Sequence, residues 1–520
     1  MVSNAMRQLE ERHMATKVDL MVWSNKMDLL ALSNAKGEVT LHRLSWQKVW
    51  SLSPPVEGLT VSGIAWRPDG KVIAIAYSNN KDILDKTDYK QVCSSGNEEN
   101  GGATGGVISC LCWPEEKGSL TGTSYNNAAQ DSASTYLPKL PPISRTFGSM
   151  TEETNEILED TKKVMDQTCL NFLLVGTTDG RLTIGVFGLF KIGVLTLPDQ
   201  GSAEIVGAEI SADLKNVFVL ALVGKVRLRL FVYDSDILAS YCREIHALAY
   251  KHGQLMSLVN YLDNTVHAIV ESYENMLLLE MESKLSQYTD STEEGTVSAD
   301  FLELLMFGVT SDELATFLLQ DLTDKGIKKL GNSIELSHSN IQKLILKHVQ
   351  AVGQNIAYHL TELRGMARHT ERFQVLGVDE TAVARSFTEN GSFLVKASEV
   401  QLVIDDSLKK YKALFKWLYT VMLRISDGRT HPDLLFSEIS QQETAFIADY
   451  LYRLTEDRDD HKGVGAKVVK LGQYICDRDL TTTVPPNPWE VLLKENQCLA
   501  KHPSIINRDQ TASLVQQHNR

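Results

Sequence analysis

The stretch at 236–283 decides the fold, and it reads DILASYCREIHALAYKHGQLMSLVNYLDNTVHAIVESYENMLLLEMES. Apolar or aromatic residues recur in it in alternating steps of three and four, a spacing that places them on one face of an α-helix. One polar residue, His252, breaks the series, and no proline interrupts it. The series consists of Leu238, Tyr241, Ile245, Leu248, His252, Leu255, Val259, Leu262, Val266, Ile269, Tyr273 and Met276. We therefore predict one long helix that packs along its length against other helices.

The residues that follow also have helical periodicity. Short polar links separate them, and long matched amphipathic helices joined by short links are typical of an antiparallel bundle. The predicted helices cover 298–307, 311–322, 324–373, 396–425 and 434–454. We assign this long helical bundle to 235–475 and a polar tail without a strand repeat to 476–520.

The residues before the long helix show a different repeat. Trp23 and Trp66 are 43 residues apart, Trp66 and Trp113 are 47 apart, and each tryptophan ends a β-like run. After Trp66 comes Pro68-Asp69-Gly70, a tight turn in which proline presets φ and glycine accepts a positive φ. A period of this length with several strands per unit is typical of WD40-type propeller blades. A β-sandwich with coincidental tryptophan spacing remains the alternative.

We predict a degenerate WD40-like propeller over 1–234, because the Gly-His and Trp-Asp marks of strong repeats are missing. Two polar stretches, 79–106 and 115–168, are predicted to be loops, the second with a short helix at 152–165. Only four or five blades can be counted, and a propeller must close its ring to hide its sheet edges. The propeller is therefore predicted to be incomplete.

Composition excludes several classes of function. The net charge of -14 argues against nucleic acid as the main partner, since phosphate binding needs a basic surface. Seven cysteines without framework spacing indicate reduced thiols in the cytosol or nucleus. Residues 1–17 are too polar for a secretory signal. The most apolar run, 182–197, contains Lys191 and three glycines, which indicates strands rather than a membrane span. We expect neither a nucleic-acid nor a membrane partner.

No motif in the chain predicts chemistry. Cys110 and Cys112 lack a second pair at metal spacing and are interpreted as core residues beside Trp113. The glycines at 101–106 lack the Lys-Ser/Thr of a phosphate loop. His246, His252 and His267 share one helix, but no two of them are four residues apart with a third ligand. We therefore predict no catalytic, cofactor-binding or metal-binding residue, no cofactor, and no enzyme activity.

Two short motifs allow a regulatory interpretation. Ser53-Pro54 is a minimal proline-directed phosphorylation site, or simply a turn. Lys494-Glu495-Asn496 matches the KEN tripeptide, a degradation signal of cell-cycle substrates, although these residues also suit a helix.

Several stretches near the start of the chain resemble one family, that of the fourth subunit of the anaphase-promoting complex (cyclosome). The resemblance rests on VWS at 22–24, DLLALSN at 28–34, GEVTLHRL at 37–44, VW at 49–50 and IAWRPDGK at 64–71. The order of blades followed by a long bundle, through about Cys476, agrees as well. The resemblance implies a WD40-like propeller with a helical bundle inserted between blades.

The resemblance also implies a function. Family members are non-catalytic scaffold parts of a multi-subunit RING-type ubiquitin ligase that drives mitotic progression and exit. We accordingly expect a hetero-oligomer in the nucleus and cytoplasm, with contacts to the large scaffold subunit, the fifth subunit and other platform subunits. The alternative function is that of a membrane-trafficking coat or tether, because such proteins also join propellers to long helices. The chain lacks the many short helix pairs of a solenoid.

The sequence departs from the family pattern in two respects. The polar stretches 79–106 and 115–168 look expanded. The chain also stops where the family chain would return to finish the propeller, and it lacks the acidic tail. We expect from this that the sequence is a fragment, an alternative product or a faulty gene model.

Overall fold

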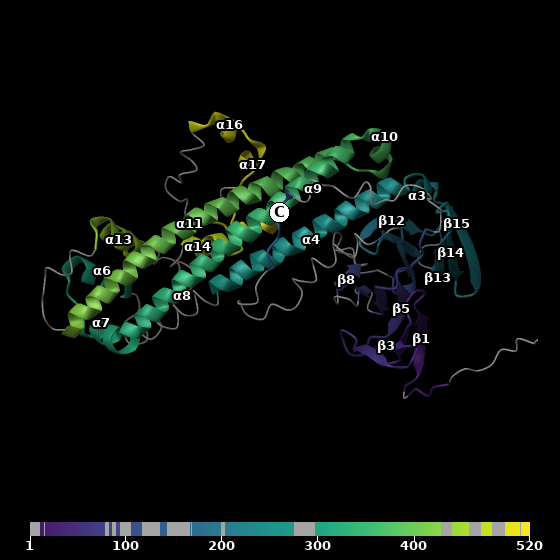
Figure 1. The fold of residues 1–520 in the computed structure, drawn as a ribbon, viewed down its shortest axis with the longest axis horizontal. Helices are drawn as coiled ribbons and strands as arrows, with labels where there is room; N and C mark the ends of the chain where they lie inside the picture. Colours follow the sequence, from purple (N-terminus) through teal and green to yellow (C-terminus); the bar gives the residue numbers. More distant parts are fainter. Residues whose placement is uncertain are drawn as a thin grey trace, which may run out of the picture. The chain divides into compact units, whose positions relative to one another are not determined.

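The computed structural model describes most of the chain in fourteen separate stretches. These are 11–14, 16–78, 83–85, 90–93, 106–116, 136–142, 167, 169–198, 203–274, 297–427, 439–456, 470–480, 495–509 and 511–519. The chain divides into two compact units (Figure 1). The first unit comprises 1–132, 158–256 and 369–377, and the second comprises 133–157, 257–368 and 378–520. Helix α4, Cys242–Tyr273, runs from the first unit into the second.

The described strands of the first unit form four antiparallel sheets, which follow one another in chain order. The first has β1 Val18–Trp23, β2 Leu29–Asn34, β3 Val39–Arg43 and β4 Lys48–Leu52. The second has β5 Val61–Trp66, β6 Ile73–Tyr77, β7 Ile83–Asp85 and β8 Lys90–Cys93. The third has β9 Ile108–Cys112, β10 Phe172–Thr177, β11 Arg181–Val186 and β12 Phe190–Thr196. The fourth has three described strands, β13 Ala203–Ile210, β14 Asn216–Val223 and β15 Arg227–Asp234.

The tryptophan repeat marks equivalent places in the first three sheets. Trp23 ends β1, Trp66 ends β5, and Trp113 directly follows β9. The predicted blade repeat is therefore confirmed as a series of meander sheets. The described strands form separate sheets that do not close into a ring (Figure 1).

Each pair of neighbouring sheets encloses its own apolar core, as packed sheets do when alternate side chains face inward. Between the first and second sheets lie Ala31, Leu41, Ile64 and Ile75. Between the second and third lie Ala65, Ala74, Leu173 and Val175. A third core joins the third and fourth sheets to the start of the long helix, through Phe172, Ile205, Val219, Leu238 and Ile245.

The predicted loop at 79–106 is wrong in part. Strands β7 and β8 lie within it and complete the second sheet, with Ile75 opposite Leu84 and Leu84 opposite Gln91. These strands have three and four residues, which is too short to show the apolar alternation that marks a longer strand. In the predicted loop at 115–168, residues 136–142 pack within the second unit. The predicted helix at 152–165 lies outside the described residues.

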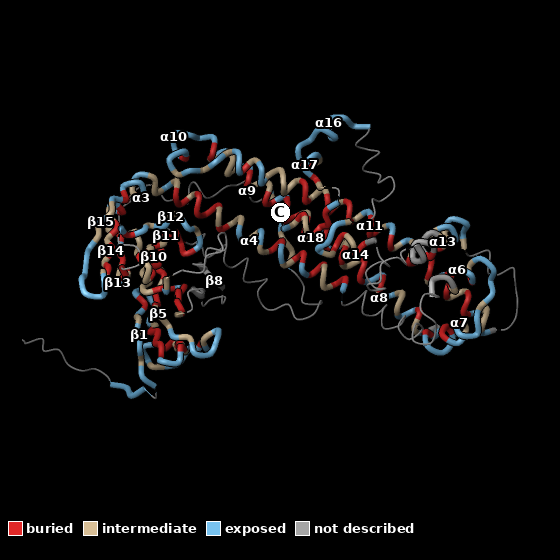
Figure 2. Tube along the Cα trace, turned by 180° about the vertical axis from the view of Figure 1, so that it is seen from behind, coloured by how far each residue is buried: buried red, intermediate tan, exposed pale blue. Residues whose placement is uncertain are grey.

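The long helix has the predicted face. A short helix, α3 Asp236–Ser240, precedes α4, and the two are separated at Tyr241. Figure 2 shows that buried residues recur along α4. The buried members of the predicted series are Leu238, Ile245, Leu248, Leu262, Val266, Ile269 and Tyr273. Val259 is 42% exposed, and Met276 lies outside the described residues.

The second unit contains the rest of the long helices. After α4, it contains α6 Val297–Phe307, α7 Asp312–Thr316 and η3 Phe317–Leu322. The single helix predicted at 324–373 is found as four successive segments, the last of which belongs to the first unit. They are α8 Asp324–Lys343, the π-helical turn η4 Leu344–Val349, α9 Gln350–Arg368 and α10 Thr370–Phe373. Helices α11 Glu380–Asp427 and α13 Gln441–Glu456 follow.

Helix α11 begins at Glu380 rather than at the predicted Lys396. Asp379 starts it by accepting the backbone N–H of Thr381 at 2.9 Å, a capping contact that satisfies an otherwise free donor. The intervening residues are rich in Ser, Thr and Asn, which weakens the apolar period there.

The predicted polar tail at 476–520 contains helices that pack on the bundle. They are α16 Gln497–Ala500, α17 Pro503–Ile506 and α18 Leu514–Asn519, and α14 Lys470–Ile475 precedes them. Buried ion pairs hold this region, since Glu399 of α11 lies 2.6 Å from Arg508 and 3.2 Å from Lys396. The polar composition of 476–520 therefore did not indicate that parts of this region are buried. Among the helices of the described stretches, none has the length and apolar character to cross a bilayer.

Candidate protein-interaction site

The two cysteines of the Cys-x-Cys motif lie in β9. Burial raises the pKa of Cys110 to about 11. Burial and the nearby Glu209 carboxylate raise the pKa of Cys112 to about 12, and the Cys112 thiol donates to Glu209 at 3.3 Å. Both thiols are therefore protonated near neutral pH and poorly suited to bind a metal.

The three histidines of the long helix have separate surroundings. His246 is buried, with Nε2 3.4 Å from the Gln167 carbonyl oxygen and its ring edge-on to Phe187. His252 packs on Phe190. His267 is exposed and lies 3.7 Å from Asp263. Among the residues that the structure describes, no group of His, Cys, Asp and Glu could hold a metal ion.

The remaining sequence motifs are only partly described. Of the glycine-rich stretch at 101–106, Gly106 alone belongs to the described residues. Ser53 is exposed after β4. In the KEN tripeptide, Lys494 lies outside the described residues, and the Asn496 side chain caps α16 by accepting from the Leu499 N–H at 3.2 Å.

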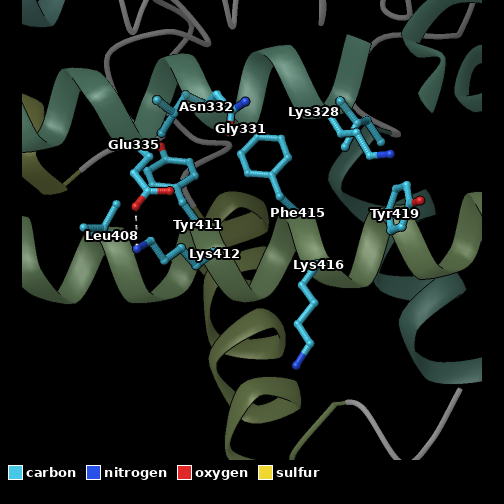
Figure 3. Close-up of a pocket in the computed structure, with 12 residues that line it drawn as sticks. Lys328, Gly331, Asn332, Glu335, Leu408, Tyr411, Lys412, Phe415, Lys416 and Tyr419 are labelled. Carbon is cyan, nitrogen blue, oxygen red and sulfur yellow. Dashed lines mark ion pairs between the residues drawn. The ribbon is translucent and has the colours of Figure 1, made fainter. Parts of the chain in front are cut away.

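A groove lies between α8 and α11 in the second unit (Figure 3). Its volume is about 280 Å³. Tyr411, Phe415 and Tyr419 line the α11 side at steps of four, which keeps them on one face of the helix. Opposite them, Gly331 of α8 leaves room for the Phe415 ring, which points toward it in Figure 3. The rings of Tyr411 and Phe415 stack at 6.4 Å.

Three lysines surround this aromatic floor. Lys328 holds its ammonium nitrogen 4.7 Å from the centre of the Tyr419 ring, a cation–π contact. Lys412 pairs with Glu335 across the groove at 2.7 Å (Figure 3). Lys416 points away from α8 and lies 3.3 Å from Glu443. The groove therefore combines an apolar floor with basic groups, in a chain of net charge -14.

This arrangement suits binding rather than catalysis. The aromatic floor can accept an apolar side chain, and the lysines can attract a neighbouring carboxylate. The lining residues include no histidine or cysteine and one carboxylate, Glu335. Sequence reasoning placed Tyr411 and Phe415 on the apolar face but did not single out a groove. The four-residue spacing of Tyr411, Phe415 and Tyr419 was the signal that could have found it.

A second candidate surface lies on the fourth sheet of the first unit. Leu228, Leu230 and Val232 alternate along β15, Val226 directly precedes the strand, and the four side chains are between 55% and 83% exposed. In register with them, Leu222, Leu220 and Phe218 of β14 lie opposite Leu228, Leu230 and Val232. Side chains two residues apart share one face of a sheet. This sheet therefore presents an exposed apolar face, a feature that often marks a protein contact.

Comparison with known proteins identifies relatives of both parts of the chain. Residues 229–428 match the family model described as anaphase-promoting complex, cyclosome, subunit 4. Residues 21–116 match the model described as the WD40 domain of anaphase-promoting complex subunit 4. The first match includes the helices from α4 to α11, and the second includes most of the first two sheets together with β9.

Individual proteins similar to this chain are named as the same subunit as the matching family models. Anaphase-promoting complex subunit 4 of Mus musculus and that of Homo sapiens are each 34% identical over 523 residues, covering 96% of this chain. The chain spans 62% of the length of each. The Dictyostelium discoideum protein is 23% identical over 325 residues, covering 58% of this chain and 37% of its own length. A solved chain titled "Crystal Structure of Mitotic Checkpoint Complex" gives a TM-score of 0.24 at 11% identity, which is too low to indicate a shared fold.

The Mus musculus and Homo sapiens relatives match 96% of this chain, and the two family models fall on its two kinds of structure, sheets and long helices. The likeness that the sequence suggested through Trp23, Trp66 and the long helix is thus confirmed. The chain belongs to the subunit 4 family of the anaphase-promoting complex.

Proposed function

We propose that this chain acts as a non-catalytic scaffold subunit of the anaphase-promoting complex, a multi-subunit RING-type ubiquitin ligase that controls mitotic progression and exit. Its partners on this proposal are the large scaffold subunit, the fifth subunit and other platform subunits. Its location is the nucleus and cytoplasm.

The main support for this proposal is that the chain belongs to this family and contains two long helices, α4 and α11. Helix α4 has 32 residues and α11 has 48, lengths that extend well beyond one sheet or one small domain. Such helices provide extended surface for neighbours. The absence of a metal-binding group among the described residues is compatible with a structural role.

The α8–α11 groove is the proposed contact for one partner segment. We expect this segment to carry an apolar side chain beside acidic residues, because Lys328, Lys412 and Lys416 surround the aromatic floor. An acidic segment is electrostatically complementary to such a site, and complementarity of charge favours the rate and specificity of association.

Affinity purification from mitotic cells tests the assignment. The tagged chain should bring down other subunits of the ligase, and recovery of the chain alone would overturn the proposal. A second arm tests the groove with Lys412→Glu, whose matched control is Lys409→Glu at an exposed position of the same helix. We expect Lys412→Glu to reduce recovery of a partner while Lys409→Glu leaves it unchanged. Equal recovery in both would remove the groove from the proposal but leave subunit membership intact.

The trafficking alternative gains no support from the matched relatives, which are named as subunits of the anaphase-promoting complex. Depletion of the protein distinguishes the two functions. Delayed exit from metaphase is expected for a ligase subunit, whereas disturbed vesicles with normal mitotic timing would favour a coat or tether.

A further inference from the structure

Residues 136–142, Tyr-Leu-Pro-Lys-Leu-Pro-Pro, form a described segment within the long connection between β9 and β10. Residues 137–142 lie outside helices and strands and contain three prolines. Proline fixes φ near the polyproline II value and lacks an N–H, so such a segment is pre-extended and presents carbonyl oxygens to a partner. We call these residues the strap.

Tyr261 of α4 makes the first polar contact with the strap. Its hydroxyl donates to the Pro141 carbonyl oxygen at 2.7 Å, and Tyr261 is only 2% exposed. The same hydroxyl lies 2.6 Å from Nδ1 of His348 in η4, whose ring stacks on the Tyr261 ring.

The direction of this hydrogen-bond chain follows from the number of protons. A phenol has one proton, and Pro141 can only accept it, so the Nδ1–H of His348 donates to the hydroxyl. His348 is 9% exposed, and burial, helped by the charge of Lys347, lowers its pKa and keeps the ring neutral. His348 thus orients Tyr261 toward the strap.

Asn355 of α9 makes the second polar contact. Its side-chain nitrogen donates to the Pro138 carbonyl oxygen at 3.0 Å and to the Ala351 carbonyl oxygen at 2.8 Å. An amide NH₂ has two protons, so both are used. Asn355 is 7% exposed.

The spacing of these contacts fits an extended proline-containing ligand. Pro138 and Pro141 are one polyproline II turn apart, and carbonyls separated by one turn of about 9 Å project from the same side. His348 and Asn355 are two helical turns apart on one face, a distance of about 10 Å. One face of the helical bundle therefore donates hydrogen bonds to two carbonyl oxygens on the same side of the strap.

We infer that Tyr261, His348 and Asn355 form a recognition site for an extended proline-containing segment, and that residues 136–142 of the same chain are its ligand. The site recognises backbone carbonyls, with proline supplying the pre-extended shape, as in other recognition of polyproline II segments. The inference does not depend on the proposed function.

The strap is expected to occupy the recognition site because both belong to the same chain. A ligand that belongs to the same chain faces its site at an effective concentration of roughly millimolar. A contact of modest intrinsic affinity is then largely occupied by the strap, and a free peptide in the micromolar range cannot displace it.

Peptide binding tests the inference in the purified full chain. The probe is a fluorescein-labelled peptide of residues 134–144, and the receptor is a chain in which Gly and Ser replace residues 136–142. We expect binding to the replaced chain with a Kd below about 1 mM, and no binding to the unmodified chain at the same concentrations. Equal binding to both chains would overturn occupancy by the strap. No binding to a replaced chain with an unchanged circular dichroism spectrum would overturn the recognition site.

Point variants identify the contact. Tyr261→Phe or Asn355→Ala in the replaced chain should weaken peptide binding about tenfold, as expected for loss of one buried hydrogen bond. Tyr358→Phe is the matched control, because its hydroxyl bonds to Glu362 on α9 instead. A uniform effect of all three would contradict the assignment.

Proteolysis of the otherwise unmodified chain gives a second readout. Tyr261→Phe should speed tryptic cleavage after Lys139, detected by mass spectrometry, whereas Tyr358→Phe should not. Unchanged cleavage in Tyr261→Phe would show that this hydroxyl does not hold the strap.

Discussion

The indole N–H of Trp66 donates to the backbone carbonyl oxygen of Val22 at a distance of 3.3 Å. This hydrogen bond joins the first strand of the second sheet to the first strand of the first sheet. We predict that Trp66→Phe, which keeps an aromatic side chain but loses the bond and part of the ring, costs at least about 1 kcal/mol in the free energy of unfolding. Trp23→Phe is the control, since Trp23 is 52% exposed at the equivalent strand end, and it should cost less. Urea unfolding of both variants measures the difference, and equal losses would refute the bridging role.

A buried charge network fixes the C-terminal helices to α11. Glu399 is 4% exposed at its side chain and lies between Lys396 and Arg508. Glu399→Gln would leave two buried cations without this counter-charge, and breaking a buried pair typically costs about 3–5 kcal/mol. Glu335→Gln, at a half-exposed pair with Lys412, should cost about 1 kcal/mol or less. Chemical denaturation should separate the two variants, and similar midpoints would contradict the network.

Close packing of α9 against α11 depends on one glycine. A Cβ on Gly353 would lie 2.9 Å from Cγ of Leu394, and Asn390 also donates to the Gly353 carbonyl oxygen at 3.0 Å. We predict that Gly353→Ala destabilises the chain by about 1–3 kcal/mol through overpacking. Gly365→Ala lies on the same helix with open space around it and should stabilise by about 0.5–1 kcal/mol. Thermal unfolding should show shifts of opposite sign; a stabilising Gly353→Ala would exclude the close contact.

Stability should fall in mild acid because of buried histidines. Burial lowers the pKa of His246, His252, His338 and His348 below the ordinary value of 6.5. A histidine with a depressed folded-state pKa takes up a proton more readily when unfolded. The stability that such a histidine contributes to the folded state is therefore complete above about pH 6.5. It decreases as the pH falls toward the lowered pKa of the folded state.

The test compares Tm at about pH 7.5 and about pH 5.5, a range above the ordinary titration of carboxyl groups. His338 is fully buried and uses Nδ1–H to donate to the Ile334 carbonyl oxygen at 2.9 Å. His338→Met should reduce the pH dependence of Tm, while the same change at exposed His267 should not. An identical pH dependence in His338→Met would exclude His338 as a contributor.

Much of the architecture could be predicted because burial imposes a period on the sequence. The heptad positions from Ile245 to Tyr273 and the strand ends at Trp23 and Trp66 follow directly from that period. Strands β7 and β8 could not be predicted because three or four residues are too few to show a period. Domain boundaries at 234 and 475 stay predictions.

The strap and the groove were harder to predict for a different reason. The strap is held through main-chain oxygens of Pro138 and Pro141, which every residue possesses, so no side-chain pattern marks the contact. Tyr261 lies beside the heptad series rather than in it. The Lys396–Glu399–Arg508 cluster joins residues more than a hundred positions apart, and no local rule connects them.

The π-helical turn η4 has a consequence for the evolution of this chain. A π turn accommodates one more residue than the α-helical turn it replaces. Loss of one residue from 344–349 would restore a regular α-helical turn and leave the residues after it on nearly the same face, because the wide turn absorbs the extra residue. Ile356 and Leu360 would then stay buried. Loss of a residue from the α-helical part of α9 before Ile356 would instead rotate the rest of the helix by about 100°. Where related sequences are one residue shorter between Ser337 and Asn355, we expect the missing residue to fall within 344–349.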